Sequence, residues 1–448
     1  MSDSIAKHAI VIGAGMAGLV AAKALSPYFD HVTILERDKL PSDAGPRQGT
    51  PQARHLHALL TGGLKALNEL LPGIEAELES AGAVRMTTSG VRLERPGFDP
   101  YPQRELGLSW LSLSRPLLEL VTRQAVERQK NIQLLDACRV TEIVARPGRP
   151  VIEGVRYDTS DHQSMHLSAD FIVDASGRGS HTLALLDSIG APKPDETEIG
   201  IDMAYSTAVF KRPVSPPSDW QTIMVLPFAP KDNRGAILSP IENDQWILSL
   251  GANHGDAPPG DFEGIVEFAK SLRTLTIYEA IKELKPIGPI MRYLLPHSVR
   301  RHFETSKYFP KGLLPIGDAI CRFNPVFGQG MTVAAQEAVI LRRLLDARAK
   351  NADPLDRLAS AFFEEIQGVL ETPWGVAMSD FVYPKTRGKR PENFEQAMQF
   401  NLGLVRLGAQ DASVHKLMFE VNHLLKGRSA LRAPDIMERV NKLMATPT

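Results

Sequence analysis

Short apolar runs and helical apolar spacing alternate along the first part of the chain, and this pattern predicts an α/β fold. Residues 8–12 and 32–35 are apolar runs with the length of buried strands, and residues 16–25 between them suit a buried helix. A strand, a helix and a second strand in succession form the unit from which parallel sheets are built. The N-terminal part is therefore predicted to carry a parallel sheet.

Further strands and helices are predicted downstream. Ser114 and Pro116 suit the N-cap and first turn of a helix with apolar residues at helical spacing, and Pro51 predicts the start of a long helix. Predicted strands follow at residues 132–135, 139–145, 151–157 and 171–174. The last of these strands runs into a glycine turn, and such strand ends are where open α/β sheets bind ligands.

A different pattern begins near residue 197. Apolar and polar residues now alternate, which predicts an antiparallel sheet covering a pocket. The alternating segments are residues 201–210, 222–226, 234–239 and 245–250. Helices are expected near residues 261–272 and 276–284, and from Pro354 onward the chain is predicted to be helical.

Composition and charge exclude several classes of protein. The 448 residues are 43% hydrophobic and 23% charged, with a net charge of −1, so the electrostatics do not favour nucleic-acid binding. The two cysteines, Cys138 and Cys321, support neither a disulfide framework nor a thiolate metal site, and they favour a reducing compartment. The first strand begins within about ten residues, and no apolar run approaches the roughly 20 residues that span a bilayer. We therefore expect a cytoplasmic protein without a signal peptide or transmembrane segment.

The first candidate site is the glycine turn after the first predicted strand. Gly13 makes the tight turn, Gly15 lets a pyrophosphate approach the backbone, and Gly18 lets the helix pack closely on the strand. Glu36 follows roughly 20 residues later, where an acidic side chain binds the ribose hydroxyls of an adenosine. Glycines alone would be a weak signal, but strand, turn, helix and acid together predict dinucleotide binding.

A basic segment between residues 47 and 57 is the second candidate. Arg47, Arg54, His55 and His57 are placed to line a flavin or its phosphates, and the alternative is an ordinary charged loop and helix start. The histidines are two positions apart, so on a helix they would point in different directions, and no metal site is predicted. Arg115, where its helix begins, is a candidate phosphate or ribose contact, or else a surface charge.

The strongest signal in the second half is the segment from Gly312 to Met331. A strand ends at Gly317 and Asp318, a tight loop with aromatic residues follows, and glycines then open a helical run over residues 332–349. Asp318 is placed to accept hydrogen bonds from a sugar-like chain, and the amides of residues 328–331 suit a developing anion. The alternative for Asp318 is a turn or N-cap residue.

Together these stretches resemble the single-chain FAD-dependent monooxygenases of the aromatic hydroxylase and polyene epoxidase type, over about residues 5–350. The resemblance implies that FAD is the cofactor, with Asp318 on its ribityl chain and residues 325–330 beside its isoalloxazine ring. The segment 47–57 looks more like the subgroup acting on polyketide or terpenoid alkenes. The FAD contacts expected from the motifs and the resemblance are Gly13, Gly15, Ala17, Gly18, Glu36, Arg37, Arg47, Arg115, Val140, Asp174, Gly317, Asp318, Gly328, Gln329, Gly330 and Met331.

The expected fold is α/β with three parts. A Rossmann-like FAD-binding domain comprises residues 1–190 and 300–350. An antiparallel-sheet substrate domain, residues 191–299, is interleaved with it. A helical C-terminal region comprises residues 351–448.

One departure from the family concerns the electron source. The family's middle motif reads Ala-Asp-Gly-x-x-Ser, and its aspartate is tied to pyridine-nucleotide as well as flavin binding. This chain has Ser176 at the position of that aspartate. Direct reduction by NAD(P)H is therefore expected to be poor, with a separate flavin reductase passing on the electrons. The competing interpretation is that Arg178 and Arg54 dock a nucleotide phosphate and restore direct use. The Gly-Trp-x-Trp-x-Ile-Pro signature of flavin halogenases does not occur, so halogenation is not expected.

The resemblance implies transfer of one oxygen atom from O₂, through a flavin hydroperoxide, to an apolar alkene or ring substrate in secondary metabolism. Epoxidation needs no protein base, and the sequence offers no compelling acid–base pair, which favours alkene or apolar-ring oxygenation over phenol hydroxylation. Two alternatives stay open: a flavin-dependent reductase or dehydrogenase of isoprenoid-like double bonds, and a non-enzymatic flavin-fold binding protein. Pocket candidates, each equally well explained as core, are Met203, Tyr205, Met224, Leu226, Phe228, Phe323, Pro325 and Phe327.

Overall fold

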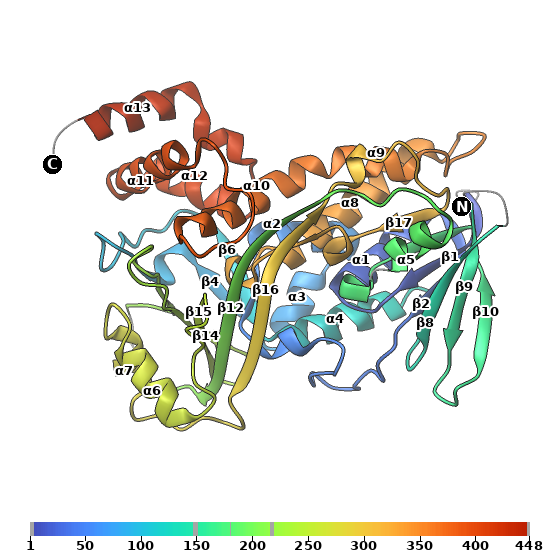
Figure 1. Cartoon of the computed structure of the whole chain (residues 1–448). Coiled ribbons are helices and arrows are strands. Elements are labelled where there is room, and N and C mark those ends of the chain that lie inside the picture. The colour runs from blue at the N-terminus through green and yellow to red at the C-terminus, as the bar shows by residue number, and fades with distance from the viewer. Residues whose placement is uncertain (1–3, 147–150, 180, 216–218, 446–448) are drawn as a thin grey trace.

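A five-stranded parallel sheet organises the N-terminal part of the fold (Figure 1). The computed structural model describes residues 4–146, 151–179, 181–215 and 219–445. The strand order is β17–β11–β1–β2–β7, and neighbouring strands are parallel. The strands are β1 Ala6–Ile12, β2 Phe29–Leu35, β7 Ile132–Leu135, β11 Phe171–Asp174 and β17 Leu313–Pro315. The predicted parallel sheet is confirmed.

Different layers cover the two faces of this sheet, as alternate residues of β1 show. Ala9 and Val11 belong to a core shared with helices α1 (Met16–Leu25), α4 (Arg115–Glu127) and α8 (Gly330–Arg348). Ile10 and Ile12 lie on the opposite face and belong to a second core. That core is shared with helix α5 and a three-stranded sheet at the right-hand edge of Figure 1: α5 His181–Ser188, β8 Arg139–Ala145, β9 Ile152–Asp158 and β10 Ser164–Ser168.

A seven-stranded, mainly antiparallel sheet forms the second half of the fold, in the order β18–β16–β12–β15–β14–β13–β5. Its strands are β5 Val91–Glu94, β12 Glu196–Lys211, β13 Thr222–Val225, β14 Gly235–Ile241, β15 Gln245–Ala252, β16 Met291–Arg301 and β18 Cys321–Arg322. Helices α6 (Phe262–Lys270) and α7 (Thr276–Ile281) share an apolar core with this sheet. The predicted antiparallel sheet is confirmed. Because β5 and β18 come from ranges assigned to the FAD-binding domain, the two halves are interleaved, and the domain boundaries stay predictions.

The remaining elements connect these sheets or follow them. A small sheet in the order β3–β6–β4 and helices α2 and α3 precede α4: β3 His57–Leu59, α2 Thr61–Leu70, α3 Ile74–Ser80, β4 Val84–Thr87 and β6 Ser109–Leu113. The C-terminal region is helical as predicted, and its part after residue 393 lies at the upper left of Figure 1. Its elements are α9 Leu358–Glu365, α10 Gln367–Ala377, α11 Phe394–Gln410, α12 Ala412–Asn422 and α13 Pro434–Ala445, with the short 3₁₀ helices η7 Met378–Val382 and η8 Arg428–Arg432. Other 3₁₀ turns are η1 Pro51–Arg54, η2 Thr88–Gly90, η3 Gly177–Gly179, η4 Phe303–Thr305, η5 Gly317–Ala319 and η6 Pro325–Phe327.

The long helix predicted from Pro51 is wrong. Only the single turn η1 follows Pro51, and the α-helix of this segment begins at Thr61. Between them the backbone is extended, because β3 pairs with β6 and the Leu56 amide donates to Ser249 Oγ at 3.1 Å. Pairing with distant strands has overridden the local preference of proline for a first helical turn.

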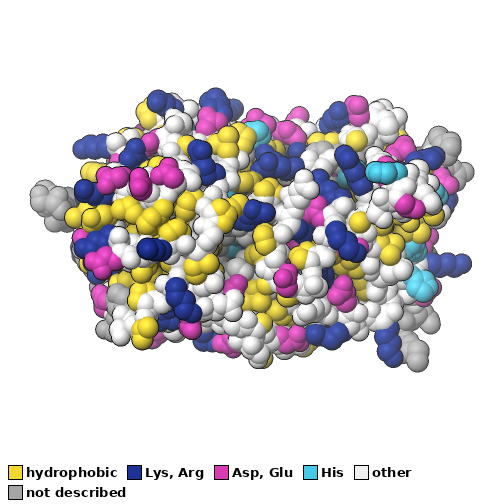
Figure 2. All heavy atoms as spheres, turned by 90° about the horizontal axis from the view of Figure 1, so that it is seen from below, with side chains coloured by type: hydrophobic (Ala, Val, Ile, Leu, Met, Phe, Trp, Pro, Cys, Tyr) yellow, Lys and Arg dark blue, Asp and Glu magenta, His cyan; other side chains and the backbone are white. Residues whose placement is uncertain are grey.

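Charged side chains of both signs are mixed over the face shown in Figure 2, while hydrophobic side chains gather on its left half. That half corresponds to the side of the seven-stranded sheet and the C-terminal helices in Figure 1. Among the described residues, none of the helices has the length and apolar character needed to cross a bilayer.

Candidate functional site

The glycine turn between β1 and α1 has two glycines that the fold requires and one that faces open space. A Cβ on Gly13, where φ is +99°, would lie 2.9 Å from the Ala175 carbonyl oxygen. A Cβ on Gly18 would lie 1.9 Å from the Gly13 carbonyl oxygen. A Cβ on Gly15 would meet nothing closer than Arg115 Nη2, at 4.0 Å. Gly15 therefore leaves room for a ligand between the turn and a guanidinium, as pyrophosphate binding needs.

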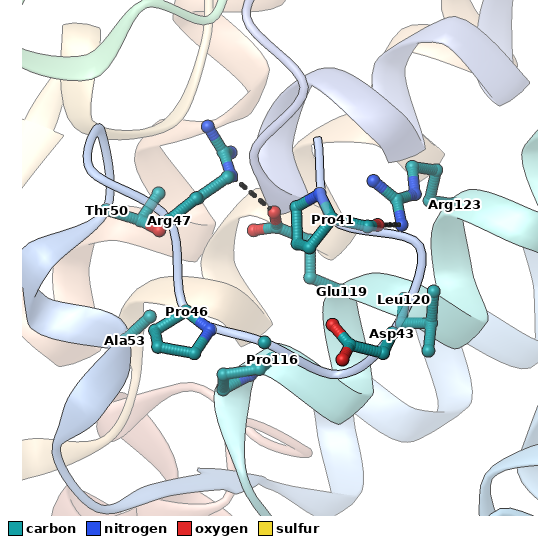
Figure 3. A pocket seen from close by; sticks show the side chains of 11 residues that line it. Pro41, Asp43, Pro46, Arg47, Thr50, Ala53, Pro116, Glu119, Leu120 and Arg123 are labelled. Atoms are coloured by element: carbon teal, nitrogen blue, oxygen red, sulfur yellow. Dashed lines mark hydrogen bonds and ion pairs between the residues drawn. The ribbon is translucent and has the colours of Figure 1, made fainter. Parts of the chain in front are cut away.

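Glu36 and Arg47 meet beside this turn. Glu36 accepts hydrogen bonds from the amides of Ala14, at 2.7 Å, and Asp38, at 2.9 Å. Arg47 lies 3.1 Å from Glu36, 2.8 Å from Asp38 and 2.7 Å from Glu119, the last contact being drawn in Figure 3. Burial works to lower the pKa of Arg47, but Glu119 and Glu36 outweigh it and raise that pKa above its ordinary value. The guanidinium is therefore a permanent cation that ties three carboxylates together.

Arg115 lies across the open space beside Gly15. Ser114 caps its helix by accepting from the Leu117 amide, as predicted, and this places Arg115 at the first turn. Its Nη2 donates to Glu119 at 3.2 Å, while its Nε is buried without a partner, and burial lowers its pKa. A buried donor left unpaired is unfavourable, and an anionic oxygen of a ligand would satisfy it.

Asp318 and Gly317 lie where β17 ends. A Cβ on Gly317, where φ is +64°, would lie 2.9 Å from Ala17 Cβ, so η5 packs against the start of α1. The Asp318 side chain is exposed to solvent on one side and has protein atoms close by on the others. This partial loss of hydration raises the pKa of its carboxyl. In the described part of the chain, no donor hydrogen-bonds to that carboxyl, which leaves its oxygens available to ligand hydroxyls.

Glu337 on α8 is a residue of this site that sequence reasoning missed. Its Oε2 accepts from the Gly317 amide at 2.8 Å, its Oε1 is buried without a partner, and burial raises its pKa to about 8. It holds the backbone turn that presents Asp318. The signal was its spacing: Glu337 lies four residues from both Val333 and Leu341, on the apolar stripe of its helix.

The loop between β18 and α8, residues 323–330, is here called the flavin loop. Gly328 has φ +66°, and a Cβ on Gly328 or Gly330 would meet no atom within 4 Å. Gln329 is buried, donates from Nε2 to the Asn422 carbonyl at 3.1 Å, and has no partner for its Oε1. Open space beside two glycines, an unpaired amide oxygen, an unpaired Arg115 donor and the free Asp318 oxygens together fit FAD.

The other expected FAD contacts lie in varied surroundings. The Asp174 carboxylate is fully buried and accepts from the amide and hydroxyl of both Ser176 and Thr182. Val140 belongs to the core beneath the parallel sheet, and exposed Arg37 lies 3.4 Å from the Gly49 carbonyl oxygen. Met331 is buried in the first turn of α8. Their contact with FAD stays a prediction, as it does for the residues above.

The pocket candidates divide into two groups. Met203, Tyr205 and Phe323 are buried in the large core that also includes one face of the parallel sheet, Phe327 packs against that core, and Pro325 is exposed. The other three lie elsewhere: Met224 packs with Met86, Val91 and Trp110, Leu226 bonds through its amide to the Glu94 carbonyl, and Phe228 is exposed beside Lys231. The structure therefore brings the β12 and loop candidates together and leaves the β13 group apart.

His55 lies beside the first group of pocket candidates. Its ring lies 6.0 Å from the ring of Tyr205 and 5.6 Å from that of Tyr293, its Nδ1 lies 2.8 Å from Thr207 Oγ1, and its Nε2 is buried without a partner. Burial lowers the pKa of His55 to about 4 and that of His57 to about 3. Both imidazoles are neutral near pH 7 and act as hydrogen-bonding groups, not cations.

Replacing Asp318 with alanine should weaken FAD binding and leave the fold intact, because the carboxyl supports no chain contact. The loss of one or two hydrogen bonds to the ribityl chain predicts a dissociation constant about 5- to 150-fold higher. Titration of the apoprotein with FAD, followed by flavin fluorescence, measures this. Asp187→Ala is the control, because its exposed carboxylate pairs only with Lys193 on the surface. An unchanged affinity of Asp318→Ala for FAD would contradict the proposal that the Asp318 carboxyl binds the ribityl chain.

Comparisons with known proteins agree with this geometry. Residues 7–361 match the family described as FAD binding domain. The chain is 31% identical to Protein Rv3254 of Mycobacterium tuberculosis over 350 residues, 76% of this chain and 73% of that protein. It is 24% identical to squalene epoxidase 3 of Arabidopsis thaliana over 366 residues, 79% of this chain and 63% of that protein.

Among solved structures, the flavin-dependent brominase Bmp2 superposes with a TM-score of 0.68 at 15% identity, over 98% of this chain and 99% of Bmp2. Identity this low shows a shared fold and nothing of the reaction. The family match covers most of the chain, including the glycine turn, Arg47, Arg115, Asp318 and the flavin loop. The chain belongs to the FAD-binding family of flavin-dependent monooxygenases.

Proposed function

We propose that the protein inserts one oxygen atom from O₂ into an apolar alkene or ring substrate, by epoxidation or hydroxylation. The observation that carries this proposal is the mainly apolar character of the buried side chains on β12 and the flavin loop, which the Tyr205–Asn324 hydrogen bond joins. Met203, Tyr205 and Phe323 are buried there, and the one imidazole beside them, His55, is neutral. These apolar side chains suit an apolar substrate, and the low pKa of His55 makes its imidazole a weak base for a phenol.

FAD, when bound and reduced, supplies the activation of O₂. The chain's own residues bind and orient. In this proposal Gly15 and Arg115 would bind the pyrophosphate, Asp318 the ribityl hydroxyls, and Gly328 and Gly330 would allow close approach of the ring, as the open space beside the glycines and the unpaired Arg115 donor support. The buried apolar side chains on β12 keep water from the reacting atoms, which favours oxygen transfer over loss of the oxidant as H₂O₂.

Incubation of metabolite extracts with the protein, reduced FAD and ¹⁸O₂ tests the proposal. The expected result, read by mass spectrometry, is a product carrying a single ¹⁸O atom. A reduced product without ¹⁸O would replace the proposal with a reductase of isoprenoid-like double bonds, and the absence of any product would favour a flavin-fold binding protein. A parallel incubation with bromide covers the reaction of Bmp2, and a brominated product would likewise overturn oxygen insertion.

For the electron source, we propose NAD(P)H acting through a separate flavin reductase. Ser176 turns inward, since its amide and hydroxyl both donate to Asp174. The competing interpretation has a geometric basis of its own. Arg178 donates to the Tyr293 hydroxyl and Arg54 lies 3.7 Å from the sulfur of Met291, so both contact the same side of β16.

Anaerobic mixing of the FAD-loaded protein with NADH or NADPH should bleach the flavin at well under about 1 per second, below ordinary turnover. Addition of a flavin reductase should restore product formation. Stopped-flow absorbance measures the bleaching, with and without candidate substrate. Fast bleaching by either nucleotide alone would show direct reduction, and its loss in Arg54→Met/Arg178→Met would locate the dock on β16.

A further inference from the structure

Residues 380–424 of the C-terminal region hold the flavin loop although they lie outside the family match, which ends at residue 361. Three side chains of the loop and of α8 are bound by these residues. Asn324 Nδ2 donates to Asp380 Oδ2 at 3.4 Å, Gln329 donates to the Asn422 carbonyl at 3.1 Å, and Gln336 donates to the Leu424 carbonyl at 2.8 Å. Two of these groups are backbone carbonyls, and the third, Asp380, is an ionisable side chain.

Asp380 lies at one end of a chain of buried hydrogen bonds that crosses the flavin loop. The Tyr205 hydroxyl on β12 donates to Asn324 Oδ1 at 2.7 Å, and Asn324 donates in turn to Asp380 on η7. The Val326 amide also donates to Asn324 Oδ1, at 3.2 Å, which fixes the orientation of the amide group. All three side chains are at most 8% exposed. The phenolic proton is thereby directed at Asn324, so the Tyr205 oxygen has only acceptor capacity left for other groups.

We propose that Asp380 is a positioning residue for the oxygenation reaction, acting through Asn324 on the flavin loop and on the Tyr205 hydroxyl. The part that concerns the reaction rests on the proposed function. The part that concerns the flavin loop does not, because it follows from the contacts of Asn324 alone.

The protonation of Asp380 makes this positioning depend on pH. Burial raises the pKa of Asp380 to about 7. The titratable groups facing it are Tyr205 from β12 and Tyr383 just beyond η7, and both hydroxyls stay protonated at neutral pH, since burial raises their pKa values. His254 lies one contact further out, beside Tyr383 and Thr386. Above about pH 7 the carboxylate accepts a charge-assisted hydrogen bond from Asn324, and below it the bond is weaker.

The visible absorbance and circular dichroism of bound FAD, recorded from pH 5.5 to 8.5, test the proposal without any substrate. The wild-type spectrum should include a transition near pH 7, and Asp380→Asn, which keeps an acceptor oxygen but cannot ionise, should lack that transition while retaining FAD. Glu337→Gln, which removes the other buried carboxyl of the site, identifies any separate change near pH 8 as that of Glu337. Asp187→Asn, which makes the same change at an exposed surface carboxyl, is the matched control and should keep the transition near pH 7. Asn324→Ala, which removes the link but keeps Asp380, should lose it.

The rate of H₂O₂ release after the reduced protein meets O₂ provides the reaction readout. It should differ about five- to tenfold between pH 6 and pH 8.5 in the wild type and less than about twofold in Asp380→Asn, as expected for one charge-assisted hydrogen bond. Heat unfolding shows whether each variant folds. A spectral transition near pH 7 that persists in both Asp380→Asn and Asn324→Ala, or a wild-type spectrum without a transition near pH 7, would overturn the proposal. Because the spectra need no substrate, a negative ¹⁸O₂ experiment leaves this result standing.

Discussion

Gly15→Val should fold normally and bind no FAD. In the ligand-free chain, a Cβ on Gly15 meets only Arg115 Nη2 at 4.0 Å, so the larger side chain has space without disturbing the turn. The same side chain would occupy the space that a pyrophosphate needs, which should weaken FAD binding by more than about 100-fold, or roughly 3 kcal/mol. Far-ultraviolet circular dichroism reports the fold, and absorbance after reconstitution with FAD reports occupancy.

Two other glycines supply the controls for this variant. Gly18→Ala should fail to fold, because its Cβ would lie 1.9 Å from a backbone oxygen that cannot move without breaking the turn. Gly368→Val, at an exposed helical position where a Cβ meets no atom within 4 Å, should fold and keep FAD. Full flavin occupancy in Gly15→Val would contradict the assignment of the pyrophosphate site.

The parts of the site that depend on local backbone geometry were predictable from sequence. Glycine is required by the positive φ at Gly13, by the close contact at Gly18 and by the turn at Gly317. The sequence therefore indicates these positions directly, through the residue type. The parallel sheet was predictable for a similar reason, since strands buried on both faces are continuous apolar runs.

The parts that depend on tertiary burial were not predictable. Glu337 and Asp380 are acidic residues within segments predicted to be helical. Only the packing of distant elements buries their carboxyls and raises their pKa values. The segment after Pro51 became extended because β6 lies beside it. The alternation of apolar and polar residues likewise predicted the strands of the antiparallel sheet but not which strands pair with each other. Met203 and Met224 were therefore both pocket candidates, although they lie in different cores.

The fold constrains the reaction less than the residues placed on it do. Bmp2 shares this fold and is a brominase, whereas squalene epoxidase 3 is named for epoxidation. The glycine turn and Asp318 are proposed to bind the cofactor and would serve either reaction. We therefore expect the residues that decide the reaction to lie on β12 and the flavin loop, where Tyr205, His55 and Asn324 are among the polar groups.

Arg47→Met should destabilise the apoprotein by about 3–5 kcal/mol, the usual result of removing one partner from a buried ion pair. The Arg47 side chain is 5% exposed and lies within 3.1 Å of carboxylate oxygens of Glu36, Asp38 and Glu119. Methionine fills a similar volume but leaves these carboxylates without their cation, beside the turn where FAD phosphates are proposed to bind. Urea unfolding of the apoprotein measures the free energy, and FAD titration should show weaker binding in parallel.

Three further variants separate charge from packing at Arg47. Arg47→Lys keeps the charge but cannot reach Glu119 and Asp38 with separate donors, so its loss should be smaller than that of methionine. Arg47→Met/Glu119→Gln should recover part of the stability, because one stranded carboxylate is then neutral, and the non-additivity of the cycle measures the coupling between the two side chains. Arg115 also donates to Glu119 at 3.2 Å, so Glu119→Gln alone gives the reference for that contact. A loss below about 1 kcal/mol in Arg47→Met would place these side chains in the solvent-screened regime of surface ion pairs and contradict their burial.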